Sequence, residues 1–206
     1  ELKEVNLSPK TEAEVIEKLM KDDHNLENLQ TLEFLMHSID NSLLFISSGG
    51  LEKILLPNLI NQTDVEVRVT LLRMLGAILQ NNLEAKKYAS EKTNLVNDLM
   101  PLLVKYSNFE ELSACLYACG SLMRHNQQVS TDVIKRILTI LLEIIGKDSV
   151  LLNLKIKSLL LIDDLISDRE IDENFMKNSK ICENLENFFA HHRNAFIGDT
   201  DAIEKC

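Results

Sequence analysis

The chain has 206 residues, of which 45% are hydrophobic and 5% aromatic, and it contains no tryptophan, three prolines and six glycines. Its formal net charge is −10 and it has no run of lysine and arginine, which argues against a nucleic-acid partner because an acidic surface repels phosphates. No apolar stretch reaches the roughly 20 residues that cross a bilayer, so we expect no membrane contact. Few prolines and glycines, and no Asn-Gly or Asp-Gly hairpin turn, predict an all-helical protein.

The first 48 residues predict three helices. Thr11 and Glu14 have the spacing of a capping box, so the first helix should begin directly after Thr11. A second helix is predicted over residues 26–39, and a short third helix over residues 42–48.

Beyond a turn predicted at Gly49 and Gly50, longer helices follow one another. Asp64 has the position of an N-cap for the helix after it, and Gly146 has the position of a C-cap. Apolar periodicity predicts helices over residues 51–61, 65–80, 83–90, 95–106, 110–125, 133–145, 150–167, 172–177 and 181–196.

A short apolar pattern recurs along these helices. It begins at Leu32, Leu75, Cys119 and Ile162, at spacings of 43, 44 and 43 residues. A period of about 40–47 residues with two or three helices per unit is typical of armadillo and HEAT repeats. We therefore predict an all-α fold, a right-handed armadillo/HEAT-like α-solenoid of about four repeats with flanking capping helices. The prediction is a single domain over residues 1–206, with repeats over 12–48, 49–92, 93–130 and 131–178 and a C-terminal capping helix over 181–196.

Solenoids present a long concave surface, so the repeat predicts a binding protein rather than an enzyme. In armadillo units the long third helix lines the concave side, and stepping its outward positions by the period gives columns of mostly polar or small residues. The alternative interpretation of these columns is a solvated helix face without a partner. The predicted partner-binding residues are Gln30, Glu33, His37, Arg73, Gln80, Tyr117, Arg124 and Asp163.

The residues that could do chemistry form no catalytic motif. There is no phosphate-binding glycine loop, nucleophile elbow or His-Glu-x-x-His sequence, so we expect no enzyme activity and no cofactor. Cys115 and Cys119 lie one helical turn apart and are interpreted as core residues. The alternative is a zinc site that adds His125 or Cys182 to them. Asn61 begins an Asn-Gln-Thr sequon in a predicted loop and is a candidate glycosylation site.

Three segments carry a resemblance to a known family. Residues 32–51 contain Leu-Glu-Phe-Leu-Met-His-Ser-Ile-Asp-Asn followed by Leu-Leu and Gly-Gly-Leu, residues 116–125 are Leu-Tyr-Ala-Cys-Gly-Ser-Leu-Met-Arg-His, and residues 155–160 are Lys-Ile-Lys-Ser-Leu-Leu. They resemble the armadillo-type nucleotide exchange factors of DnaK-type heat-shock chaperones. The first segment is most similar to the endoplasmic-reticulum branch that serves BiP, the Sil/Sls family, and the missing tryptophan favours this branch over the cytosolic one. The resemblance covers about residues 26–165.

The resemblance implies a function and a partner. A family member would clasp one lobe of the ATPase domain of BiP with its concave face, favour an open nucleotide cleft and promote ADP release, in support of protein folding and translocation. It would be monomeric on its own and would reside in the lumen of the endoplasmic reticulum, with the cytoplasm as the alternative. The alternative function is an armadillo scaffold that binds another protein or a peptide without an effect on nucleotide.

Overall fold

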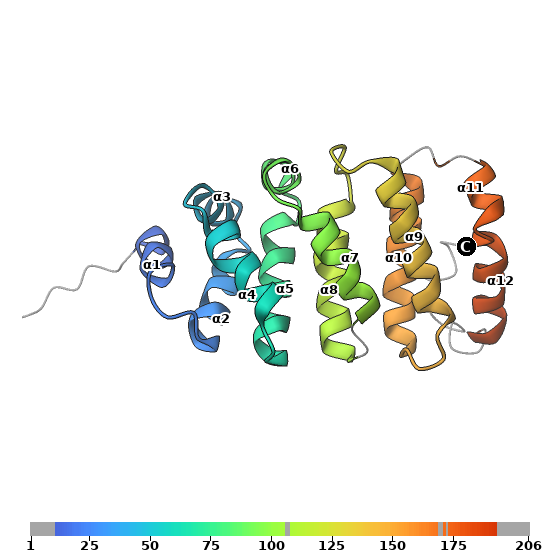
Figure 1. Ribbon diagram of the computed structural model, residues 1–206, viewed down its shortest axis with the longest axis horizontal. Helices are drawn as coiled ribbons and strands as arrows, with labels where there is room; N and C mark the ends of the chain where they lie inside the picture. The colour runs from blue at the N-terminus through green and yellow to red at the C-terminus, as the bar shows by residue number, and fades with distance from the viewer. Residues whose placement is uncertain (1–10, 106–107, 169–170, 172, 193–206) are drawn as a thin grey trace, which may run out of the picture.

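The computed structural model describes residues 11–105, 108–168, 171 and 173–192. Its elements are α1 (Glu12–Leu19), α2 (Leu26–Leu35), α3 (Ile39–Ser47), the π-helical turn η1 (Leu51–Leu55), α4 (Leu56–Asn61), α5 (Val65–Leu79), α6 (Leu83–Lys92), α7 (Leu95–Lys105), α8 (Phe109–Met123), α9 (Thr131–Gly146), α10 (Leu152–Ser167), α11 (Glu173–Asn178) and α12 (Ile181–His192). The helices stand in a row from α1 to α12, and the described part of the chain contains no strand (Figure 1). This confirms the predicted all-α, armadillo-like solenoid.

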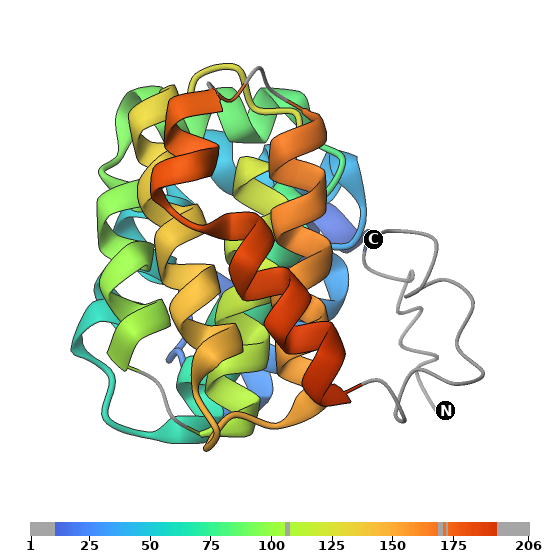
Figure 2. The ribbon, with the colours of Figure 1, turned by 90° about the vertical axis from the view of Figure 1, so that its right-hand side faces the viewer.

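The helices of the row form two layers. α2, α5, α8 and α10 pack against one another in succession, and we call these four helices the inner row. α4, α7 and α9 pack on the inner row as the second layer, while α3 and α6 lie along one edge of the molecule (Figure 1). Figure 2 looks along the row, with α9 and α10 in different layers and α12 running diagonally across the end.

The inner helices repeat at the interval found in the sequence. α5, α8 and α10 begin at Val65, Phe109 and Leu152, so their starts are 44 and 43 residues apart. The division into repeats remains a prediction. The last four residues of the capping helix predicted over 181–196 lie outside the described residues.

The core is continuous along the row, and α5 and α8 are its most enclosed part. Every residue from Val69 to Leu79 is buried except Arg73, and every residue from Glu111 to Met123 is buried except Ser113 and Tyr117. Full burial of a Leu or Ile side chain contributes roughly 1.5–3 kcal/mol. The inner helices are therefore held mainly by apolar contact on both sides.

Cys115 and Cys119 lie in this core, as predicted, and both are free thiols. A hydrogen bond with Cys119, together with burial, raises the pKa of the Cys115 thiol. Within the described residues no group of three His, Cys, Asp or Glu side chains could hold a metal ion.

The second helix ends earlier than the predicted residue 39. α2 stops at Leu35, whose carbonyl accepts a hydrogen bond from Asn41 Nδ2 at 3.1 Å, and Ser42 Oγ donates to the Met36 carbonyl at 2.7 Å. These two side chains satisfy carbonyl groups at the helix end. The chain therefore turns, and α3 begins at Ile39 rather than at residue 42.

The helix predicted over residues 51–61 is divided into η1 and α4. Pro57, at the start of α4, has no N–H with which to continue the α-helical hydrogen bonds, and the turn before it widens to a π-helix. Gly49 supplies the predicted turn with a φ of +81°. Gly50 packs so closely on Phe45 that a Cβ atom there would overlap the ring.

Among the described helices, no single one is both long and apolar enough to span a membrane. That test is met only when Ile39–Ser47 and Leu51–Asn61 are taken together, although these segments are bent by 71° relative to each other.

Candidate partner-binding surface

The predicted binding residues lie on the inner row, and we call the surface they form the inner-row face. Their positions are the ones the core leaves open. On α5, Arg73 is exposed between buried neighbours, and on α8, Tyr117 is half-buried between buried neighbours. Of all eight residues, the exposed ones are Gln30, His37, Arg73 and Gln80, and the half-buried ones are Glu33, Tyr117, Arg124 and Asp163.

Tyr117 links the two central inner helices. Its ring lies directly over Gly76 of α5, where a Cβ atom would overlap the ring, and its hydroxyl donates to Gln80 Oε1 at 2.8 Å. A glycine at this point allows the helices to approach with the aromatic ring between them. Tyr117 is therefore a structural contact between units as well as a surface residue.

The electrostatic surroundings of Tyr117 extend to a third inner helix. Burial raises the pKa of the Tyr117 phenol, the negative charge of Glu33 on α2 raises it further, and a hydrogen bond with Ser121 lowers it. Glu33 lies 3.5 Å from His37 Nε2, measured to its Oε1. The protonated phenol is therefore favoured, with Glu33 of α2 and the Gln80 amide at the end of α5 both near it.

Polar side chains also join α8 to α10. Arg124 Nε donates to Asp164 Oδ2, and Lys157 Nζ donates to Ser113 Oγ at 2.7 Å. Between these two links lies a pocket of about 180 Å³, lined by Ser113, Leu116, Tyr117, Arg124, Lys157, Leu160 and Leu161. The inner-row face therefore contains a small pocket lined by two cationic side chains, Arg124 and Lys157, and by apolar ones.

A buried lysine ties the end of α8 to α6. Lys86 Nζ donates to the Arg124 carbonyl at 2.7 Å, and burial, with a smaller contribution from the Arg124 charge, lowers the pKa of Lys86 against an opposing effect of Asp168. Asp168 also accepts from the His125 backbone N–H at 2.9 Å. A cation at the last carbonyls of a helix is favourable because the helix dipole is negative there.

Three residues of the inner-row face were not in the predicted set. Lys157 and Leu160 line the α8–α10 pocket, and Phe34 on α2 is 74% exposed. The repeat period places Leu160, 43 residues after Tyr117, at the corresponding surface position, but an apolar side chain is more typical of a buried residue. Phe34 stands within the apolar repeat pattern, and pattern alone does not reveal that it faces solvent.

A second exposed surface runs along the edge of the molecule where the outer helices connect to the inner ones. It consists of single large apolar side chains, in contrast to the mixed charges of the inner-row face. These are Ile60, Val65, Val104, Phe109 and Leu151.

The candidate glycosylation site lies at the end of α4. Asn61 is exposed, and its Nδ2 donates to the Pro57 carbonyl at 2.9 Å. Glycosylation remains a prediction.

The fold and its inner-row face define an armadillo-like α-solenoid, a class of protein that presents an extended binding surface. Comparison with known proteins identifies the family. Residues 41–191 match the SIL1/FES1/HPBP1 C-terminal domain, and the chain belongs to this family. The chain is 37% identical over 145 residues to the nucleotide exchange factor Sil1 of Drosophila melanogaster. The match covers 70% of the chain but 34% of that relative, so the chain spans about a third of the relative's length.

Proposed function

We propose that the chain acts as a nucleotide exchange factor for a DnaK-type (Hsp70) chaperone, and that the chaperone is BiP in the lumen of the endoplasmic reticulum. The observation that carries the proposal is the match of residues 41–191 to the SIL1/FES1/HPBP1 domain, supported by the 37% identical relative that is an exchange factor. The protein would act by binding rather than by catalysis.

The inner-row face is the surface we assign to the chaperone's ATPase domain. It offers an exposed cation at Arg73, a half-buried tyrosine and arginine at Tyr117 and Arg124, and acidic groups at Glu33 and Asp163. Tyr and Arg are the residue types most enriched among interface hot spots. Charges of both signs give a partner its orientation more than its affinity.

Exchange then follows from linkage. If the protein binds the open, nucleotide-free cleft more tightly than the closed cleft, it must weaken nucleotide binding by the same factor. A coupling free energy of about 3 kcal/mol would change nucleotide affinity more than a hundredfold. No catalytic group is needed for this effect.

The binding surface is tested with a matched pair of arginines. Arg73 is exposed on α5 in the inner row, and Arg136 is exposed on α9 in the second layer. Arg73→Ala should weaken binding to the isolated ATPase domain of BiP by about 1–4 kcal/mol in calorimetry, the range of a hot spot. Arg136→Ala should bind as the wild type does, and both variants should melt as the wild type does. If Arg73→Ala and Arg73→Glu both bind normally, the inner-row face is not the binding surface.

A scaffold and an exchange factor differ in their effect on nucleotide. We expect substoichiometric protein to speed the release of labelled ADP from BiP, and Arg73→Glu to slow this release. Binding that depends on Arg73 but leaves ADP release unchanged would favour a scaffold. The compartment is tested separately, by locating the product of the full gene: a cytosolic distribution would move the partner to a cytosolic Hsp70.

A further inference from the structure

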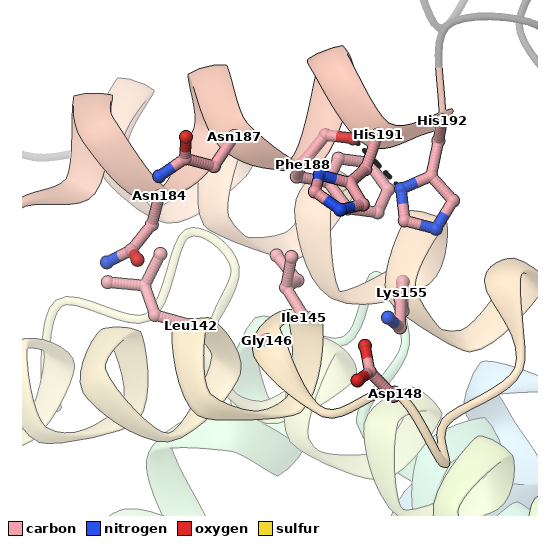
Figure 3. Close-up of a pocket in the computed structure, with 10 residues that line it drawn as sticks. All are labelled: Leu142, Ile145, Gly146, Asp148, Lys155, Asn184, Asn187, Phe188, His191 and His192. Carbon is pink, nitrogen blue, oxygen red and sulfur yellow. Dashed lines mark hydrogen bonds between the residues drawn. The ribbon is translucent and has the colours of Figure 1, made fainter.

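A second pocket lies at the C-terminal end of the row, away from the inner-row face. It has a volume of about 170 Å³ and is enclosed by the end of α9, the start of α10 and α12 (Figure 3). Both sides of the pocket carry apolar and polar side chains (Figure 3). The lining residues are Leu142, Ile145, Gly146, Asp148, Lys155, Asn184, Asn187, Phe188, His191 and His192.

The unusual member of this pocket is Lys155. Its residue is 5% exposed, so its stem is enclosed by the protein, and its ammonium group reaches the space of the pocket (Figure 3). Among the described residues it has no hydrogen-bond or ion-pair partner for its Nζ atom. Asp148 points toward it in Figure 3, but the two form no ion pair. Burial of an unpaired charge is unfavourable, and buried charges in proteins are normally paired.

At the centre of the row, a cation at the corresponding helix position forms an ion pair. Arg68 and Lys155 each lie four residues after the residue that precedes their helix, in α5 and α10 respectively. Arg68 Nε donates to Glu111 Oε1 on the next inner helix at 2.7 Å. Lys155 instead faces α12, whose side chains in the pocket are amides, imidazoles and an aromatic ring. The carboxylate that completes the central pair has no counterpart on α12 among the pocket residues.

We propose that this pocket binds a carboxylate group, with Lys155 as its cationic partner. The Asn184 and Asn187 amides supply further hydrogen-bond donors. His192 Nδ1 lies 2.9 Å from the Phe188 carbonyl, which can only accept, so Nδ1 carries a proton and donates to that carbonyl. The apolar side chains of Leu142 and Ile145 on one side and Phe188 on the other would cover the aliphatic part of the ligand (Figure 3).

Asp148 should weaken the binding of a carboxylate in this pocket, which gives a second way to test the proposal. It is the acidic residue of the pocket, and its charge should repel a bound carboxylate. Removal of that charge should therefore tighten binding. A ligand that instead used an ammonium group would bind more weakly after the same change.

The test is a titration followed by nuclear magnetic resonance, with butanoate as the probe and butanamide as its neutral match, at constant ionic strength. Butanoate should cause saturable shifts in the side-chain amides of Asn184 and Asn187, whereas butanamide should not. Lys155→Met should weaken butanoate binding at least about tenfold, the loss expected for a hydrogen bond to a charged group. Lys155→Arg should retain binding, as should Lys92→Met, which removes an exposed lysine of α6 outside the pocket.

Asp148→Asn should tighten butanoate binding, and this result does not depend on the folding of the Lys155 variants. The proposal is overturned by the absence of saturable shifts, by equal binding of butanamide, or by unchanged binding in folded Lys155→Met. A parallel titration with N-acetyl-glutamate amide separates the two sources of a carboxylate. If it binds more tightly than butanoate, the site receives an acidic side chain of a protein partner; if butanoate binds more tightly, the site receives a free short-chain acid.

Discussion

Between α5 and α8 the half-buried Arg68 forms an ion pair with Glu111, whereas between α10 and α12 the buried Lys155 forms no ion pair within the described residues. The centre also has a glycine under an aromatic ring and N-caps on its inner helices, while α10 begins without a side-chain cap. A central unit of a solenoid has neighbours on both sides and the last unit has one. The polar groups of the central units are therefore paired within the protein, whereas the last unit has polar groups that a bound molecule could pair with.

The largest expected effect comes from the central ion pair. Arg68 and Glu111 have side chains only 13% and 8% exposed, so Glu111→Leu should lower the free energy of unfolding by about 3 kcal/mol, as is typical for breaking a buried pair. Urea denaturation measures the loss, and the double change Arg68→Met with Glu111→Leu should lose less. At the other end, Lys155→Met should leave stability equal or raised. If the Glu111→Leu protein were as stable as the wild type, the ion pair at the centre would not distinguish it from the C-terminal end of the row.

The second effect compares two glycines. Gly76→Ala would place a methyl group into the Tyr117 ring, which should cost about 1–3 kcal/mol of unfolding free energy as overpacking does. Gly146, at the end of α9, has nothing within 4 Å of a Cβ position. Gly146→Ala should therefore be neutral or stabilising by up to about 1 kcal/mol, because alanine has less backbone entropy to lose. Equal melting temperatures for the two variants would contradict the close approach of α5 and α8.

The third effect concerns the helix starts. Asn108 Oδ1 accepts from the Glu110 backbone N–H at 2.8 Å and caps α8, whereas Leu151 occupies the same place before α10 and caps nothing. Asn108→Ala should destabilise by about 1 kcal/mol, and Leu151→Asp should stabilise by a similar amount. Thermal denaturation of both variants gives the comparison. A stabilising Asn108→Ala would mean that the observed cap is not used.

The smallest effect is the contribution of Tyr117, at the centre of the row, to the pH dependence of stability. The pKa of Tyr117 is raised in the folded protein, so its unfolded phenol loses its proton first. The stabilising contribution of the phenol is complete below about pH 10 and is lost as the pH rises further. The stability advantage of wild type over Tyr117→Phe should shrink above pH 10. An advantage that grows with pH would reverse the assigned direction of the shift.

The sequence was sufficient to predict the solenoid and the side of each inner helix that faces outward. The period of 43–44 residues, combined with helical spacing, identified Arg73 and Tyr117 among the positions of α5 and α8 that are not buried. Both results depend on helical periodicity, which is a property of local sequence.

The contacts between units could not be predicted in the same way. Nothing in the local sequence shows that Tyr117 lies on Gly76, that Lys157 reaches Ser113, or that Lys155 lacks a partner. Each of these depends on how far one helix is displaced along its neighbour. The early end of α2 is similar, because it depends on hydrogen bonds from Asn41 and Ser42 in the following helix. Propensity and spacing describe a helix in isolation, and these features arise only when two helices meet.

The links across the inner-row face have a mechanical consequence. A row in which each helix touches only its neighbours bends like an elastic rod, and its stiffness is set joint by joint. At one joint the surface link is the Tyr117–Gln80 hydrogen bond over a glycine; at the next, Arg124–Asp164 and Lys157–Ser113 act together. A ligand that engages Tyr117 or Arg124 must compete with these links. Part of the binding free energy would then be used to bend the row. The curvature of the row would therefore differ between the free and the bound protein.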